Sequence, residues 1–136
     1  MRSAITCVMI DDDIDDQEIF LYAMREIDPE IACRFFNDGD VAVRELLKEE
    51  DFLPDCFFID LNMPRMHGKA CLAEIKKIDR LKRVPVAIYT TSADPKDKAD
   101  TLQAGADAYI VKEASLVDLK PRLKAFLANI SGGNHD

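Results

Sequence analysis

The 136-residue sequence lacks any long run of apolar residues. A membrane-spanning helix needs about 18–20 of them in succession. The apolar stretch nearest the N-terminus, residues 5–10, is much shorter and is followed at once by acidic residues. Only Arg2 is basic before that stretch, whereas a secretory signal begins with a basic segment. We therefore expect no membrane span, no signal peptide and a cytoplasmic location.

Closely spaced cysteine pairs are also missing, because the four cysteines form no C-x-x-C motif. Each one lies within an apolar segment, where a free thiol behaves as a small hydrophobic side chain. This pattern predicts reduced core cysteines in a cytosolic protein. The four residues are Cys7, Cys33, Cys56 and Cys71.

The sequence also lacks an excess of basic residues, since its formal net charge is -8. A strongly acidic chain repels the phosphate backbone, so we expect no direct binding to nucleic acid. Cations and basic protein surfaces are its natural partners. The length suits one domain, which we assign to residues 1–130, and the polar, glycine-containing segment 131–136 reads as a disordered tail.

Five short apolar runs alternate with segments of helical spacing. The helical pattern is clearest in the last segment, where Leu119, Leu123, Phe126 and Ile130 recur at intervals of three and four. Strand–helix alternation predicts an α/β fold with a parallel sheet covered on both faces. Arg34 interrupts the second run, which suits an edge strand. The runs span residues 5–10, 31–36, 56–59, 84–89 and 107–111.

Two helix boundaries are marked by their residues. Asp94 followed by Pro95 is typical of a helix start, and Gly105 of a helix end. Pro121 lies inside the last helical pattern, where proline removes a backbone hydrogen bond. Two interpretations stay open there: a separate first turn before a helix that starts near Lys120, or one kinked helix.

Polar side chains stand at the carboxyl ends of four of the predicted strands. Asp11 and Asp12 follow the first, Asp60 the third, Thr90 the fourth and Lys112 the fifth. Because the carboxyl ends of parallel strands meet at one edge of the sheet, we expect these groups to converge.

Three carboxylates at one place need a neutralising partner. Two like charges ~4 Å apart repel by ~4 kcal/mol at an effective dielectric constant of ~20, so the cluster requires raised pKa values or a cation. Oxygen ligands of this kind suit Mg²⁺. A carboxylate beside the metal can attack a phosphoryl group to form an acyl phosphate, and a hydroxyl and an ammonium can stabilise the other phosphoryl oxygens.

With these residues in this order, the chain resembles the response-regulator receiver family over residues 5–130. The resemblance is carried by residues 8–13 (VMIDDD), 57–68 (FFIDLNMPRMHG), 86–90 (VAIYT) and 104–112 (AGADAYIVK). It implies a doubly wound, flavodoxin-like sheet of five parallel strands in the order 2-1-3-4-5.

The resemblance also implies roles around a metal. Asp60 is expected to be the phosphoacceptor. Asp12 would bind Mg²⁺ directly, Asp11 would assist in the same acidic pocket, and the backbone carbonyl of Asn62 would complete the protein's share of the ligands.

Further roles concern the phosphoryl group and the response to it. Thr90 would hydrogen-bond to the phosphoryl group and Lys112 would pair with it. Tyr109 occupies the aromatic switch position of the family. Asn62 and Ser92 occupy two variable positions that tune the lifetime of the phosphoryl group.

The implied function is that of a stand-alone switch in a two-component phosphorelay, not an enzyme acting on a separate substrate. A histidine kinase or phosphotransfer protein would donate the phosphoryl group, with Mg²⁺ required. Output would pass to an unidentified protein through the segments 95–104, 107–111 and 116–130. Homodimer formation stays open.

Two residues depart from the family pattern. Glu113 follows Lys112, where the family usually has a proline after a cis peptide bond. Either this bond is trans and Lys112 sits differently, or the loop is strained. His67 replaces a common acidic residue, and we assign it no role.

Several charged residues have simpler interpretations. Asp13 is predicted to cap the first helix, and Asp15 and Asp16 to form a solvated helix start. Residues 96–100 read as a solvated helix face. The helix over 95–104 has few apolar residues, so we expect low local stability there.

Three other functions fit the sequence less well. A haloacid dehalogenase-like phosphatase would need an aspartate where Asn62 stands, to act as general acid. A flavodoxin-like flavin carrier would need a phosphate-binding loop where the aspartate run lies. The complete set of Asp12, Asp60, Thr90 and Lys112 disfavours a receiver-like module that works without phosphorylation. The departure at Glu113 keeps this alternative open.

Overall fold

The structure, a computed structural model, describes residues 4–112 and 115–133. Five strands form one parallel sheet in the order β2-β1-β3-β4-β5, which confirms the predicted topology and leaves β2 at an edge. Among the described residues, no helix is long and apolar enough to cross a membrane. The strands are β1 (Thr6–Ile10), β2 (Ala32–Phe36), β3 (Cys56–Ile59), β4 (Val86–Thr90) and β5 (Ala108–Val111).

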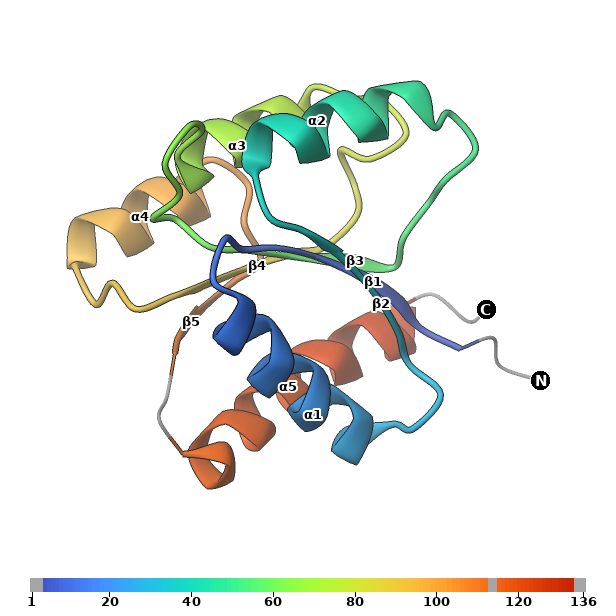
Figure 1. Cartoon of the computed structure of the whole chain (residues 1–136), viewed down its shortest axis with the longest axis vertical. Helices are drawn as coiled ribbons and strands as arrows, with labels where there is room; N and C mark the ends of the chain where they lie inside the picture. Colours follow the sequence, from blue (N-terminus) through green and yellow to red (C-terminus); the bar gives the residue numbers. More distant parts are fainter. Residues whose placement is uncertain (1–3, 113–114, 134–136) are drawn as a thin grey trace.

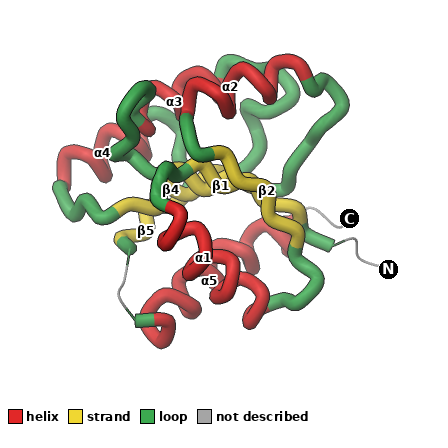
Figure 2. Tube along the Cα trace, viewed as in Figure 1, coloured by secondary structure: helices red, strands yellow, loops and turns green. Residues whose placement is uncertain are grey.

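Helices cover both faces of the sheet (Figure 1). The tube view in Figure 2 shows α1 and α5 together beneath the strands and α2, α3 and α4 above them. Each crossover from one parallel strand to the next contains one helix, as parallel pairing requires. The helices are α1 (Ile14–Ile27), α2 (Gly39–Lys48), α3 (Gly68–Lys76), α4 (Pro95–Gln103) and α5 (Leu116–Gly133).

Alternating side chains of the central strands build two separate cores. In β3, Phe57 belongs to the core under α2 and α3, whereas Phe58 belongs to the core under α1 and α5. The Phe58 ring lies 4.7 Å from the ring of Phe20 in α1 and 5.2 Å from that of Phe126 in α5, between ring centroids. Each such buried ring contributes roughly 1.5–3 kcal/mol to folding, so both helices are held firmly against the sheet.

The predicted helix boundaries at three positions are confirmed. The Asp13 side chain accepts a hydrogen bond from the backbone N–H of Asp16, and Asp94 accepts one from Lys96. Gly105 has φ of 111°, the left-handed conformation that ends α4 without strain. These caps fix where the loops at the carboxyl edge of the sheet begin and end.

The last helix resolves the open question at Pro121. It is one helix from Leu116 that contains Pro121, rather than a separate turn followed by a start near Lys120. The missing N–H would have bonded to the carbonyl of Val117, in the exposed first turn, where water is an alternative partner. The helix also runs to Gly133, into the predicted tail, and residues 134–136 lie outside the described part.

Candidate functional site

Backbone hydrogen bonds of the sheet continue past the strand ends and fix the functional residues. The N–H of Asp11 donates to the carbonyl of Phe36 (3.0 Å), and that of Asp60 donates to Ile10 (2.9 Å). At the other side, the N–H of Lys112 donates to the carbonyl of Thr90 (2.7 Å). The sheet itself therefore sets the positions from which these side chains project.

Asp11, Asp12 and Asp60 come together as the sequence predicts. One carboxylate oxygen from each lies within 4.8 Å of the others. Asp11 is fully buried, Asp60 is nearly so, and Asp12 is exposed. The cluster thus has two inner carboxylates and one outer one, all oxygen donors. Such a donor set fits a hard divalent cation that keeps several water ligands.

Lys112 is the cation within this acidic cluster. Its Nζ lies 2.8 Å from Asp11 Oδ2 and 3.8 Å from Asp60 Oδ2, and its side chain is 9% exposed. The ammonium also lies 5.5 Å from the centre of the Tyr89 ring. Lys112 therefore sits at the site despite the departure at residue 113, although the Lys112–Glu113 bond itself is outside the described residues.

Asp16 is the functional neighbour that the sequence interpretation missed. Its Oδ2 lies 2.7 Å from Lys112 Nζ, so it is not simply part of a solvated helix start. The helical repeat carries a signal for this placement. Phe20 and Met24, four and eight residues further on, are both fully buried and therefore lie on the same inward side of α1. Asp15, in contrast, is exposed as expected.

Burial and charge shift the pKa values of these groups. Burial raises the pKa of Asp11 to about 6, against the opposing effect of Lys112. Burial also raises the pKa of Asp60, opposed by Lys112 and by a hydrogen bond from Thr90. The pKa of Lys112 is raised, because its contacts with Asp11 and Asp16 outweigh the effect of burial. Without another cation the acids are incompletely neutralised.

Thr90 and Asn62 lie at Asp60 as predicted. Thr90 is fully buried at the end of β4, and its hydroxyl hydrogen-bonds to the Asp60 carboxylate. The backbone N–H of Asn62 also hydrogen-bonds to that carboxylate, while the Asn62 side chain is exposed. The roles of the Asn62 carbonyl as a metal ligand and of its side chain in tuning stay predictions.

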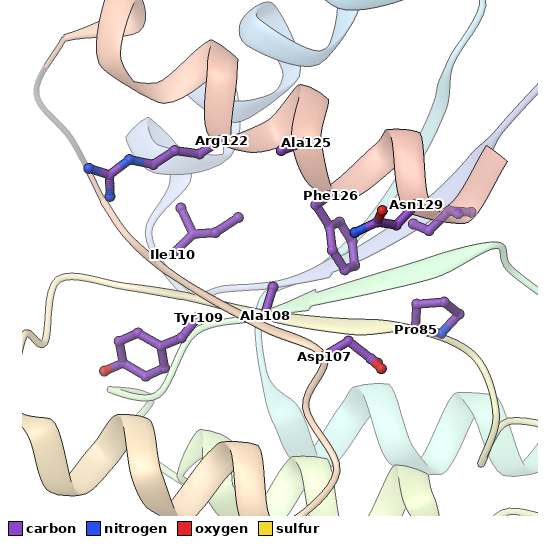
Figure 3. A pocket seen from close by; sticks show the side chains of 10 residues that line it. Pro85, Asp107, Ala108, Tyr109, Ile110, Arg122, Ala125, Phe126 and Asn129 are labelled. Atoms are coloured by element: carbon purple, nitrogen blue, oxygen red, sulfur yellow. The ribbon is translucent and has the colours of Figure 1, made fainter. Parts of the chain in front are cut away.

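Ser92 links this edge to α4 and β5. Its backbone N–H donates to Thr90 Oγ1 (3.3 Å), and its hydroxyl donates to Asp97 (2.6 Å). The Tyr109 hydroxyl donates to the Ser92 carbonyl (2.9 Å). Figure 3 shows the Tyr109 ring on the side of β5 opposite Ile110, toward α4. Thr90, Ser92 and Tyr109 thus form one connected set.

The helix face at 96–100 is not simply solvated, which corrects the prediction. Lys69 of α3 reaches across to Asp97 (2.8 Å) and Asp100 (3.0 Å). Lys96 also pairs with Asp100 at 2.9 Å. The sequence offered no sign of this contact, because Lys69 and Asp100 are 31 residues apart and belong to different helices. These ion pairs supplement a helix whose buried residue is Thr101.

The loop between β3 and α3 gives His67 a structural role that the sequence interpretation did not assign. Its Nδ1 accepts a hydrogen bond from the backbone N–H of Lys69 (3.2 Å), so His67 caps α3. The adjacent Gly68 donates its N–H to the carbonyl of Leu61 (2.9 Å). This turn brings the start of α3 directly against the backbone that carries Asp60.

A cavity of about 590 Å³ lies elsewhere, between β5 and α5 (Figure 3). Its lining includes Ala108, Ile110 and Phe126, together with Asp107. The Asp107 carboxylate already accepts a hydrogen bond from the N–H of Val86 (2.9 Å). The cavity is therefore largely apolar, and its one carboxylate is engaged in holding β4 to β5.

A model of the response regulator receiver domain family matches residues 8–124. The chain belongs to this family. The match confirms the resemblance to the receiver domain, the signalling domain of two-component systems. The phosphatase and flavin-carrier alternatives are not favoured.

Curated relatives agree with this assignment. Response regulator Rcp1 of Synechocystis sp. is 33% identical over 87 residues, which cover 61% of this chain and 59% of Rcp1. Transcriptional regulatory protein PrrA of Mycobacterium tuberculosis is 31% identical over 120 residues, covering 88% of this chain and 48% of PrrA. The chain thus spans about half to three fifths of these relatives.

Solved structures share the whole fold. The phosphorylated cyanobacterial phytochrome response regulator RcpA superposes with a TM-score of 0.82 at 25% identity, covering 93% of this chain and 96% of RcpA. The Mn²⁺-bound form of Rcp1 gives a TM-score of 0.79 at 25% identity, covering 91% and 92%. One neighbour is thus a phosphorylated protein and another a metal-bound one.

Proposed function

We propose that this receiver domain is a phosphorylation switch whose acceptor is Asp60. The observation that carries the proposal is the meeting of Asp12, Asp11 and Asp60 within 4.8 Å, with Thr90 and Lys112 beside them. Asp60 is held by the sheet and is only 5% exposed. The Asp60 carboxylate is therefore shielded from bulk water, but it lies next to Asp12, the exposed acid of the cluster.

The chemical step would be phosphoryl transfer to a carboxylate. An Asp60 oxygen would form a bond to phosphorus while the phosphorus–nitrogen bond of a donor phosphohistidine breaks. The electron pair of the broken bond would remain on the imidazole nitrogen, and an acyl phosphate would form on Asp60. Thr90 and Lys112 would then hydrogen-bond to the phosphoryl oxygens.

Mg²⁺ is the metal we propose for the acidic cluster. Asp12 and Asp60 would bind it, Asp11 would assist from the inner side, and the Asn62 carbonyl would be a further ligand. When bound, the ion supplies charge neutralisation for the oxygens of the transferring group. The raised pKa values of Asp11 and Asp60 support this proposal, because burial disfavours their charged forms and a bound cation would offset that cost.

The response would begin at Thr90. Its hydroxyl accepts the N–H of Ser92, so a Thr90 that turned to a phosphoryl group would release that loop. The loop carries the acceptor of the Tyr109 hydroxyl, and α4 follows it. We propose that this coupling changes the surface of α4, β5 and α5, with Tyr109 as the switch and Ser92 as a tuning position. A downstream protein would bind there; homodimer formation is the alternative use of that surface.

The partners and setting are part of the same proposal. A histidine kinase or phosphotransfer protein would donate the phosphoryl group, and the chain would act as a switch rather than as an enzyme on a separate substrate. A cytoplasmic location is supported by the four free cysteines, of which Cys7, Cys56 and Cys71 are buried.

Phosphorylation by a small donor tests the proposal. The chain is incubated with acetyl phosphate with and without Mg²⁺, and its intact mass is recorded. We expect the mass of one phosphoryl group to appear only with Mg²⁺, and to be absent from Asp60→Asn. Asp15→Asn is the matched control and should label like the wild type. A wild-type chain that never takes up the group would instead favour a module that works without phosphorylation.

A further inference from the structure

Asp16 and Asp60 both lie near the Lys112 ammonium, at unequal distances. Lys112 Nζ is 2.7 Å from Asp16 Oδ2 and 3.8 Å from Asp60 Oδ2. The shorter distance is that of a charge-assisted hydrogen bond, and the longer is not. In this state the ammonium therefore hydrogen-bonds to Asp16 and forms a close ion pair with Asp11, whereas Asp60 is more distant.

The position of Asp16 is fixed by the start of α1. Its backbone N–H donates to the Asp13 cap (3.2 Å). The next residue, Gln17, is buried and donates from Nε2 to the Asp11 carbonyl (2.7 Å) and to Asn37 Oδ1 (2.6 Å). The first turn of α1 is thus tied to the loop that carries Asp11. Asp16 presents its carboxylate from a rigid support rather than from a freely moving chain.

We infer that Asp16 is a positioning residue that holds Lys112 in a resting place and competes with a phosphoryl group on Asp60 for it. This inference rests on the proposed function. A lysine ammonium has three N–H donors. One of them hydrogen-bonds to Asp16, and Asp11 lies 2.8 Å from Nζ as an ion-pair partner. To bind phosphoryl oxygens closely, Nζ must move toward Asp60 and weaken its bond to Asp16. The strength of that bond therefore sets part of the cost of reaching the activated state.

Asp15 provides the matched comparison. It lies one residue earlier in the same helical turn, carries the same charge and is exposed. Asp15→Asn removes one negative charge near the start of α1 without changing a contact of Lys112. Asp16→Asn removes the same charge and also weakens the bond to Nζ. A difference between the two variants therefore reports the loss of the contact between Asp16 and Lys112 Nζ, rather than the loss of one negative charge.

Beryllofluoride, a tetrahedral mimic of the phosphoryl group, is the probe. Its dissociation constant is measured by ¹⁹F NMR with Mg²⁺ present, for the wild type and both variants. We expect Asp16→Asn to bind it about threefold more tightly or better, as for loss of a partly exposed ion pair, and Asp15→Asn to match the wild type. Unchanged or weaker binding by Asp16→Asn, or an equal gain in Asp15→Asn, would overturn the inference.

A second readout needs neither Mg²⁺ nor the phosphoryl mimic. ¹⁵N NMR of the Lys112 ammonium should show slowly exchanging protons in the wild type and faster exchange in Asp16→Asn only. Equal exchange in all three proteins would overturn the resting contact. If the wild type binds no beryllofluoride, the proposed function fails; if it binds and Asp16→Asn is unchanged, the inference alone fails.

Discussion

Gly68 packs against Asp60 so closely that a Cβ atom on Gly68 would overlap the Asp60 backbone carbonyl oxygen. The same atom would lie 2.6 Å from the Cα of Leu61. Both neighbours are backbone atoms, which cannot rotate out of the way as a side chain can. The glycine is thus required for the turn that brings α3 against the strand end carrying the proposed phosphoacceptor.

We therefore expect Gly68→Ala to lower the free energy of unfolding by about 1–3 kcal/mol, as overpacking does. It should also slow labelling of Asp60 by acetyl phosphate, since the backbone of Asp60 must shift. Urea unfolding and the labelling rate measure the two effects. Gly39→Ala is the control: its nearest neighbours would be Met66 atoms at 3.3 Å, so its loss should be clearly smaller. Equal losses would contradict the argument.

Charge crowding gives a prediction for Asp12. Because it is the exposed member of a cluster within 4.8 Å, Asp12→Asn relieves repulsion without opening the core. In EDTA, we expect its melting temperature to exceed that of the wild type by about 2–5 °C. Thermal unfolding followed by circular dichroism measures it, and a clear drop would show that the acids are not crowded.

The same cluster predicts a response to metal. Millimolar Mg²⁺ should raise the melting temperature of the wild type, because an ion that binds only the folded chain stabilises it. Asp12→Ala should respond little, while Asp15→Asn should respond like the wild type. An equal shift in all three proteins would mean that the ion acts elsewhere.

The raised pKa of Asp11 predicts how stability depends on pH. Its pKa is about 6 in the folded chain and about 3.9 in an unfolded one. Between these values the folded chain binds the extra proton, so stability falls as pH rises from about 4 to 6. The full effect is roughly 3 kcal/mol, and Asp60 acts in the same direction.

Urea unfolding in EDTA at several pH values tests this dependence. The wild type should lose stability over that window more steeply than Asp11→Asn, which keeps the shape of the side chain but cannot titrate. Parallel curves for the two proteins would show that Asp11 is ionised without penalty and that its burial has been offset by Lys112.

The weakly packed α4 predicts fast hydrogen exchange. Thr101 is its one buried residue, and Leu102 is 41% exposed. Amides of residues 95–103 should therefore exchange faster than those of α1. Lys69→Met, which removes the ion pairs to Asp97 and Asp100, should increase the rate further. Lys77→Met, which removes an ion pair to Glu74 at the C-terminal end of α3, should not. Slow exchange of the α4 amides would refute the low local stability expected for this helix.

The strand ends account for what the sequence could predict. Apolar runs located Ile10, Ile59 and Thr90 to within a residue or two, and parallel pairing then required the groups that follow them to converge. The strand order and residue roles came from the family resemblance. Predictions tied to backbone geometry were therefore the most reliable.

Contacts between helices could not be predicted in the same way. Asp16 and Lys112 are 96 residues apart, and their contact depends on the rotation of α1 about its axis. Apolar character alone does not set that rotation, because Ile14 is 52% exposed whereas Phe20 is fully buried. With Phe20 as the guide, Asp16 would have faced the site.

Peptide mapping of the phosphorylated residue tests the central claim most directly. The chain is labelled with acetyl phosphate and Mg²⁺, the acyl phosphate is reduced with borohydride, and the modified residue is located by tandem mass spectrometry. We predict modification at Asp60 alone. Modification at Asp11 or Asp12, or at a residue outside the cluster, would contradict the assignment of Asp60 as the acceptor.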